Sequence, residues 1–147
     1  MTHEAATEVD VPLRDVVTVR IPASGAYLAV LRTATAGLGA RLALTLDEIE
    51  DLRMAVDEAC ALLLSSAIAG SDLTCAFELA GDGLRIAVTV SSRDGVLPRR
   101  DTFAWTVLTA LAGDVDARVD AENRVTIELF KQRDGATTSP SADGDRA

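Results

Sequence analysis

The chain has 147 residues, of which 48% are hydrophobic, and its formal net charge is −9 at pH 7. This length suits one domain with a single core. The negative charge argues against nucleic acid as the main partner, because binding to phosphates requires a basic surface. An acidic surface instead suits solubility or a basic protein partner.

Charge and polar residues interrupt every apolar run before the ~18 residues that a membrane-spanning helix needs. The polar, acidic stretch from Met1 to Asp10 lacks the apolar segment of a secretory signal, so we expect a cytoplasmic protein without membrane contact. Cys60 and Cys75 lie within apolar segments and are expected to be buried free thiols. A disulfide or a redox role is the alternative.

Composition divides the chain into one domain and two tails. Residues 1–14 are mixed and polar, and residues 134–147 are small and polar without a core-forming side chain. Such segments bury too little apolar surface to fold. We therefore expect a flexible N-terminus over 1–14, a domain over 15–133 and a disordered tail over 134–147.

The domain begins with a predicted strand and helix. A β-branched, roughly alternating run over 16–21 indicates a strand. Ser24 is a candidate N-cap for a helix that runs to about Leu38. Gly37 and Gly39 are expected to end this helix.

A second helix begins at a capping box, in which the Thr45 hydroxyl and the Glu48 carboxylate satisfy the first free amides. It is expected to continue to about Ile68. Apolar residues recur every three or four positions, which predicts one face packed on a core. These residues are Ile49, Leu52, Val56, Ala59 and Leu63.

The second half predicts two hairpins separated by a helix. Strands over 73–80 and 84–91 are joined by Gly-Asp-Gly, which is a tight-turn signal. A third helix is expected over 102–112, followed by strands over 115–119 and 124–130. The order β-α-α-β-β-α-β-β favours an α+β fold. We expect a two-layer α/β sandwich in which three helices cover one face of a mostly antiparallel sheet.

A family resemblance rests on three runs of sequence. Residues 44–64, LTLDEIEDLRMAVDEACALLL, resemble the second helix of the RsbW/SpoIIAB group of anti-sigma factors and serine kinases. Residues 21–33, IPASGAYLAVLRT, are similar to the first strand and helix of that group. Residues 102–115, TFAWTVLTALAGDV, are similar to the C-terminal helix of its actinobacterial UsfX-like branch. The resemblance covers about 16–131 and implies the Bergerat fold of histidine-kinase-like ATPases.

The resemblance implies that Glu58 occupies the position of the family's general base. The family places an asparagine that holds Mg²⁺ four residues later, on the same line of the helix. Leu62 stands there in this chain and has no lone pair for Mg²⁺, which requires oxygen ligands. We therefore expect no metal site, and a carboxylate without a catalytic role is the alternative for Glu58.

The family also holds adenine with a D-x-G-x-G motif after the second central strand. Asp94 and Gly95 are, with Glu58, the candidate nucleotide-binding residues, but no second glycine follows them. By distance from the strand, Ser92 holds the place of the aspartate. The alternative for Asp94 and Gly95 is an ordinary turn.

The glycine-rich lid that cradles phosphates in the family has no counterpart in residues 99–109, which contain no glycine. Phe103 and Trp105 are expected where phosphates would sit. Arg99 and Arg100 either attract an anion or form a solvated basic pair. These motifs predict no cofactor and no kinase activity, with binding of ATP and Mg²⁺ as the remaining alternative.

Arg32 matches the exposed arginine of the first helix through which SpoIIAB-type proteins contact the sigma factor. An ordinary exposed arginine is the alternative, and Tyr27 is expected in the core. The resemblance implies a homodimeric anti-sigma factor that sequesters an alternative sigma factor and is relieved by a STAS-domain anti-anti-sigma factor. Two alternatives are an ATP-dependent serine kinase that acts on this antagonist and a scaffold for another signalling partner.

Overall fold

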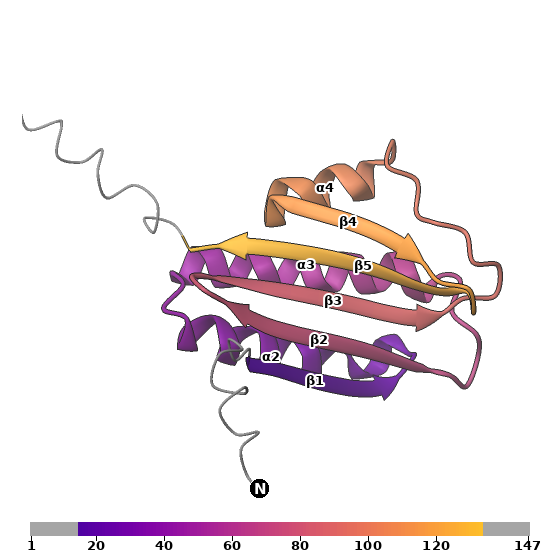
Figure 1. Ribbon diagram of the computed structural model, residues 1–147, viewed down its shortest axis with the longest axis horizontal. Coiled ribbons are helices and arrows are strands. Elements are labelled where there is room, and N and C mark those ends of the chain that lie inside the picture. The colour runs from indigo at the N-terminus through magenta and orange to yellow at the C-terminus, as the bar shows by residue number, and fades with distance from the viewer. Residues whose placement is uncertain (1–14, 134–147) are drawn as a thin grey trace, which may run out of the picture.

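Five antiparallel strands form one sheet in the order β1-β2-β3-β5-β4, and three helices cover one of its faces (Figure 1). The structure is a computed structural model that describes residues 15–133. The strands are Asp15–Pro22 (β1), Asp72–Ala80 (β2), Gly83–Ser91 (β3), Asp114–Val119 (β4) and Arg124–Gln132 (β5). The expected α+β class is confirmed, whereas both predicted tails lie outside the described residues.

The core lies between the sheet and the helices. Alternate residues of a strand point to opposite faces, and in β3 the buried positions are Leu84, Ile86, Val88 and Val90. The residues between them face away from the helices and are half-buried. Among the described residues, no helix is both long enough and apolar enough to span a membrane.

The helices are α2 (Leu28–Arg41), α3 (Leu46–Leu64) and α4 (Phe103–Ala112), with a 3₁₀ turn, η1 (Gly25–Tyr27), before α2. The capping box of α3 is confirmed: Thr45 Oγ1 accepts the Glu48 N–H at 3.1 Å, and Glu48 Oε1 accepts the Thr45 N–H at 2.7 Å. The apolar stripe predicted for α3 is buried along its whole length. This helix therefore anchors the helical layer on the sheet.

The bounds predicted for the first helix were wrong at both ends. Ser24 caps the 3₁₀ turn, by accepting the Ala26 N–H at 3.2 Å, and α2 itself begins at Leu28. The helix then runs through both glycines to Arg41. A Cβ on Gly39 would lie 2.9 Å from Ile49 Cγ1 of α3. Gly39 therefore allows close packing of the two helices instead of ending the first.

Two further expectations are corrected by tertiary contacts. Helix α3 ends at Leu64 and not near Ile68, because the chain turns there to pair with the end of β3: the Ile68 N–H donates to the Ser91 carbonyl at 2.9 Å. Tyr27 is 46% exposed and does not enter the core. It lies in the 3₁₀ turn, whereas the fully buried residues of α2 begin at Leu31.

Candidate functional site

Helices α2 and α3 form a hairpin that brings Arg32 opposite Asp57. Arg32 Nη1 donates a hydrogen bond to Asp57 Oδ1 at 3.0 Å. The two side chains are 37% and 38% exposed, so the ion pair lies at the border between the helix interface and solvent. The pair is therefore held in place by packed helices and is still open to a second protein.

The guanidinium of Arg32 has most of its hydrogen-bonding capacity left. An arginine side chain carries five N–H donors in a planar fork, and the bond to Asp57 is the one that Arg32 makes among the described residues. The other donors can bind a carboxylate of a partner in the bidentate manner typical of arginine. Partner binding by Arg32 stays a prediction, and this geometry suits it.

Glu58 is a half-buried carboxylate of α3, and it makes no hydrogen bond or ion pair within residues 15–133. Along the same line of the helix, Ala55 is buried and Leu62 packs against the core. The other carboxylate on this line, Asp51, is seven residues away, which is about 10 Å along a helix axis. Two carboxylates at that spacing do not share one metal ion.

The loop after β3 is closed on itself by Ser92. Its side chain is 3% exposed, and its Oγ accepts the Gly95 N–H at 3.0 Å and donates to Asp94 Oδ1 at 3.0 Å. The same carboxylate oxygen accepts the Val96 N–H at 3.1 Å. These hydrogen bonds lower the pKa of Asp94 below its ordinary value, and the bond from the Val96 N–H contributes most. Asp94 thus supports its own turn, which fits the alternative stated for it.

Gly95 adopts the left-handed conformation that this turn requires, with φ at +66°. A Cβ at this position would lie 2.4 Å from the side-chain oxygen of Asn123, in the turn between β4 and β5. The space beside Gly95 is therefore filled by the protein itself. No approach to a nucleotide base is left open on this side of the glycine.

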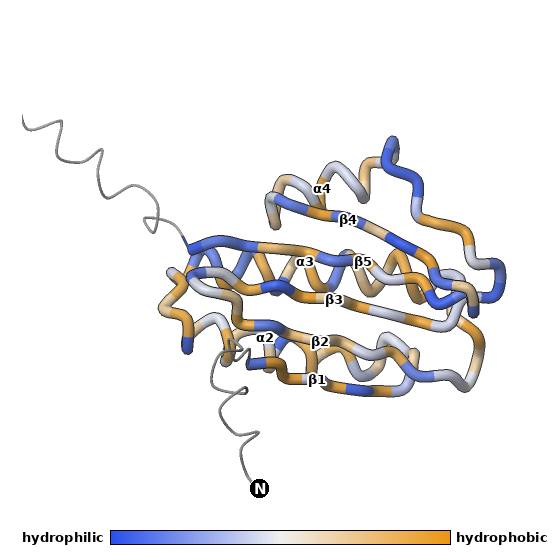
Figure 2. The backbone as a smooth tube through the Cα atoms, in the orientation of Figure 1, coloured by the Kyte–Doolittle hydropathy of each residue, from blue (hydrophilic) through white to orange (hydrophobic). Residues whose placement is uncertain are grey.

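The segment from the β3 loop into α4 differs from expectation at Trp105. Phe103 is 83% exposed, but Trp105 is 5% exposed and belongs to the core. The two residues cannot both lie over a phosphate site, because Trp105 faces inward from the first turn of α4. In Figure 2 this connection carries both strongly hydrophilic and strongly hydrophobic stretches.

Arg99 and Arg100 are each engaged with the protein. Arg99 makes a bidentate pair with Asp101 at 2.7 and 3.1 Å. Arg100 bonds Asp116 at 2.7 Å, and its guanidinium lies 4.8 Å from the centre of the Trp105 ring. Asp101 thus occupies one edge of the Arg99 guanidinium, and the Trp105 ring covers one face of the Arg100 guanidinium.

The residues present do not fit Mg·ATP at the position that the resemblance implies. Within the described range, no group of three or more histidine, cysteine, aspartate or glutamate side chains is arranged to hold a metal ion. Leu62 offers no oxygen, one carboxylate oxygen of Asp94 is engaged in its own loop, and protein atoms fill the space beside Gly95.

Cys60 and Cys75 are free and buried, as expected. Burial, reinforced by the charge of Asp57, raises the pKa of the Cys60 thiol to about 12, and burial also raises the pKa of Cys75. A thiol is nucleophilic as its thiolate, so neither side chain is reactive at neutral pH. The packing role is the one that the structure supports.

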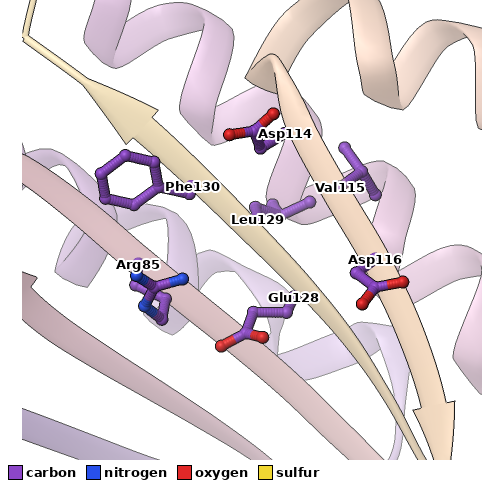
Figure 3. A pocket seen from close by; sticks show the side chains of 7 residues that line it. All are labelled: Arg85, Asp114, Val115, Asp116, Glu128, Leu129 and Phe130. Carbon is purple, nitrogen blue, oxygen red and sulfur yellow. The ribbon is translucent and has the colours of Figure 1, made fainter.

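One cavity lies on the open face of the sheet, opposite the helices, and another lies at the edge of the sheet beside α2. The first, of about 310 Å³, lies over β3, β4 and β5, where Figure 3 shows Arg85, Asp116, Glu128 and Phe130 on the same face. The Arg85 guanidinium stacks on the Phe130 ring at 4.9 Å. The second, of about 470 Å³, lies between β1 and the end of α2. Glu58 lines neither of them.

Sequence reasoning missed Asp57, although it placed Glu58 beside it. The available signal was the antiparallel helix hairpin implied by the short connection after α2. In such a hairpin an arginine on the first helix and an aspartate on the second fall opposite each other at matching distances from the turn. Asp57 was passed over because it lies on the other side of α3 from the line that contains Glu58.

No protein-family model matches the chain. It is 38% identical over 90 residues to the anti-sigma-F factor RsbW of Mycobacterium tuberculosis, an alignment that covers 60% of this chain and 52% of that protein. It is 33% identical over 107 residues to a serine-protein kinase RsbW of Bacillus cereus, covering 71% of this chain and 62% of the relative. The chain thus spans 52% and 62% of the length of these two relatives.

Among solved structures, the chain is similar to the RsbU and RsbW domains of Rv1364c from Mycobacterium tuberculosis. The TM-score is 0.63 at 16% sequence identity, and the match covers 81% of this chain and 32% of that one. At this identity the likeness concerns the fold. The sequence comparisons confirm the resemblance of the chain to RsbW-type proteins, and the structural comparison confirms the similarity of the fold.

Proposed function

We propose that this protein is an anti-sigma factor that sequesters an alternative sigma factor and is relieved by a STAS-domain anti-anti-sigma factor. The observation that carries the proposal is the state of Arg32 in an RsbW-like fold. Its side chain is 37% exposed, and its guanidinium donates one N–H to Asp57, so the remaining donors are available to a partner. The relative with 38% identity is named an anti-sigma-F factor.

Release of the sigma factor then depends on competition by the antagonist and not on phosphorylation. Two observations support weak or absent nucleotide binding. Among the described residues no group of side chains is arranged to hold a metal ion, and Asp94 is hydrogen-bonded within its own loop. The proposal includes a cytoplasmic homodimer that binds neither nucleic acid nor membrane. The net charge of −9 supports the exclusion of nucleic acid.

A pull-down from a lysate of the host tests the proposal. The tagged wild-type protein should recover an alternative sigma factor, and Arg32→Ala should recover much less of it. Arg20→Ala is a matched control, because Arg20 is an exposed arginine that pairs with Asp72 on β2, in the sheet and not in the helix layer. Recovery of no sigma factor, under conditions where an RsbW relative recovers its own, contradicts the proposal. Recovery of a different signalling protein alone supports the scaffold alternative.

The second candidate is an ATP-dependent serine kinase that acts on the STAS-domain antagonist. It is favoured by the free carboxylate of Glu58 within the described residues and by relatives named serine-protein kinases. Calorimetry with Mg·ATP separates the candidates. Micromolar binding that disappears in Glu58→Ala supports the kinase, whereas no heat at millimolar nucleotide excludes it.

A further inference from the structure

The backbone that carries Arg32 is rigid, so the freedom left to this residue is in its side chain. Leu31 and Thr35, on either side of it in α2, are fully buried. The Thr35 hydroxyl donates to the Leu31 carbonyl at 2.7 Å, and close contact between Gly39 and Ile49 fixes the spacing of α2 and α3. An exposed arginine on such a helix still samples many rotamers, and restricting them costs free energy on binding.

Asp57 restricts those rotamers before any partner arrives. It holds one terminal nitrogen of the guanidinium, Nη1, at 3.0 Å by a single hydrogen bond. One monodentate bond restrains the position of this nitrogen and leaves the other N–H groups without a partner among the described residues. A bidentate pair, such as that of Arg99 with Asp101, would instead occupy one whole edge of the guanidinium.

We propose that Asp57 is a positioning residue for partner binding: it holds the Arg32 side chain across the α2–α3 interface so that the remaining edge of the guanidinium receives a carboxylate of the partner. The inference rests on the proposed function and adds the chemistry of the contact, an acidic side chain of the partner. Asp57 itself does not contact the partner. Its effect on affinity passes through Arg32.

Binding is measured with each purified alternative sigma factor of the host as the probe. Asp57→Ala should weaken binding by about fivefold, because the arginine must then be ordered on binding. Asp57→Asn keeps an acceptor oxygen and should stay within about twofold of wild type. Glu50→Ala is a matched control that removes another α3 carboxylate paired with an arginine, Arg53, and should leave the affinity unchanged.

A double-mutant cycle shows whether Asp57 acts through Arg32. In an Arg32→Ala background, Asp57→Ala should have no further effect on affinity. An equal loss in both backgrounds overturns the proposal, because Asp57 would then act independently of the arginine. Tighter binding by Asp57→Ala also overturns it, because the aspartate would then compete with the partner.

A second arm needs no partner and separates this inference from the proposed function. Side-chain NMR of the Arg32 Nε–H group should report an ordered guanidinium in the wild type, in Asp57→Asn and in Glu50→Ala, and a mobile one in Asp57→Ala. Equal mobility in wild type and Asp57→Ala overturns the inference whether or not a sigma factor binds. Absence of sigma-factor binding with an ordered Arg32 contradicts the proposed function alone.

Discussion

Two regions of the molecule, the α2–α3 hairpin and the β3–α4 connection, hold charged groups that pair within the protein in different ways. In the hairpin, the pair of Arg32 and Asp57 uses one N–H of the guanidinium and leaves the others without a partner among the described residues. In the β3–α4 connection, Asp94 is bonded to Ser92 and Val96, and Arg100 to Asp116 and the Trp105 ring.

The difference shows which region is equipped to recognise another molecule. A group that already makes its bonds within the protein must lose them before it binds a ligand, and a new contact then gains little. A group with unused donors on a fixed backbone breaks no such bonds on binding, so the new contact contributes its full free energy. The fold is similar to that of a solved structure with an RsbW domain, while the loop after β3 is closed by hydrogen bonds among its own residues.

The largest expected effect concerns Trp105, whose ring lies in the core under α4. Trp105→Ala should lower the free energy of unfolding by about 3–5 kcal/mol, because it removes a large buried side chain and leaves a cavity. Denaturant unfolding measures this change.

Phe103→Ala is the control for the same segment, because the Phe103 side chain is 83% exposed. It should change the stability by no more than about 0.5 kcal/mol. Equal losses of stability for the two variants would contradict this description, in which Trp105 packs in the core and Phe103 points to solvent.

A smaller effect is expected at Gly95, in the closed loop. Gly95→Ala should destabilise the protein by about 1–2 kcal/mol, because alanine is strained at positive φ and its Cβ would meet the Asn123 side chain. Gly37→Ala, in the exposed interior of α2 with no atom within 4 Å of the added Cβ, should stabilise it by about 0.5–1 kcal/mol. Thermal unfolding of the two variants tests this comparison, because Gly95→Ala should lower the melting temperature and Gly37→Ala should raise it.

The smallest effect is the pH dependence of the Asp94 turn. Its pKa is lowered in the folded protein, first by the Val96 N–H and then by the Ser92 hydroxyl. The stabilisation by the ionised carboxylate is therefore present above the pKa of an unfolded aspartate and is lost as the pH falls through the lowered value. Carboxyl-carbon NMR should show a low titration midpoint for Asp94 that rises in Ser92→Ala. An unchanged midpoint in that variant would show that the hydroxyl does not hold the loop.

Much of the fold follows from local signals in the sequence. The capping box at Thr45, the apolar stripe of α3 and the glycine turn between β2 and β3 each fix one element through contacts within a few residues. The helix ends did not follow, because tertiary contacts determine them. Gly39 lies inside α2 since it packs on Ile49, and α3 stops at Leu64 since the following residues pair with the end of β3.

The candidate site was only partly accessible from the sequence for the same reason. The absence of a metal ligand at Leu62 can be read from one residue type, but the role of Asp94 depends on where Ser92 points its hydroxyl. The position expected for Trp105 was wrong, although Trp105, Leu108 and Ala112 recur at helical spacing and form the buried face of α4. Asp57 lies 25 residues from Arg32 along the chain, so their pairing appears only when the helix hairpin is formed.

The most direct test of the account is sigma-factor binding without nucleotide, measured for wild type, Arg32→Ala and Glu58→Gln. The account predicts that the wild type binds, that Arg32→Ala weakens binding by at least about tenfold through loss of a charge-assisted contact, and that Glu58→Gln binds as the wild type does. Binding that requires Mg·ATP and is lost in Glu58→Gln, while Arg32→Ala is unaffected, would contradict it.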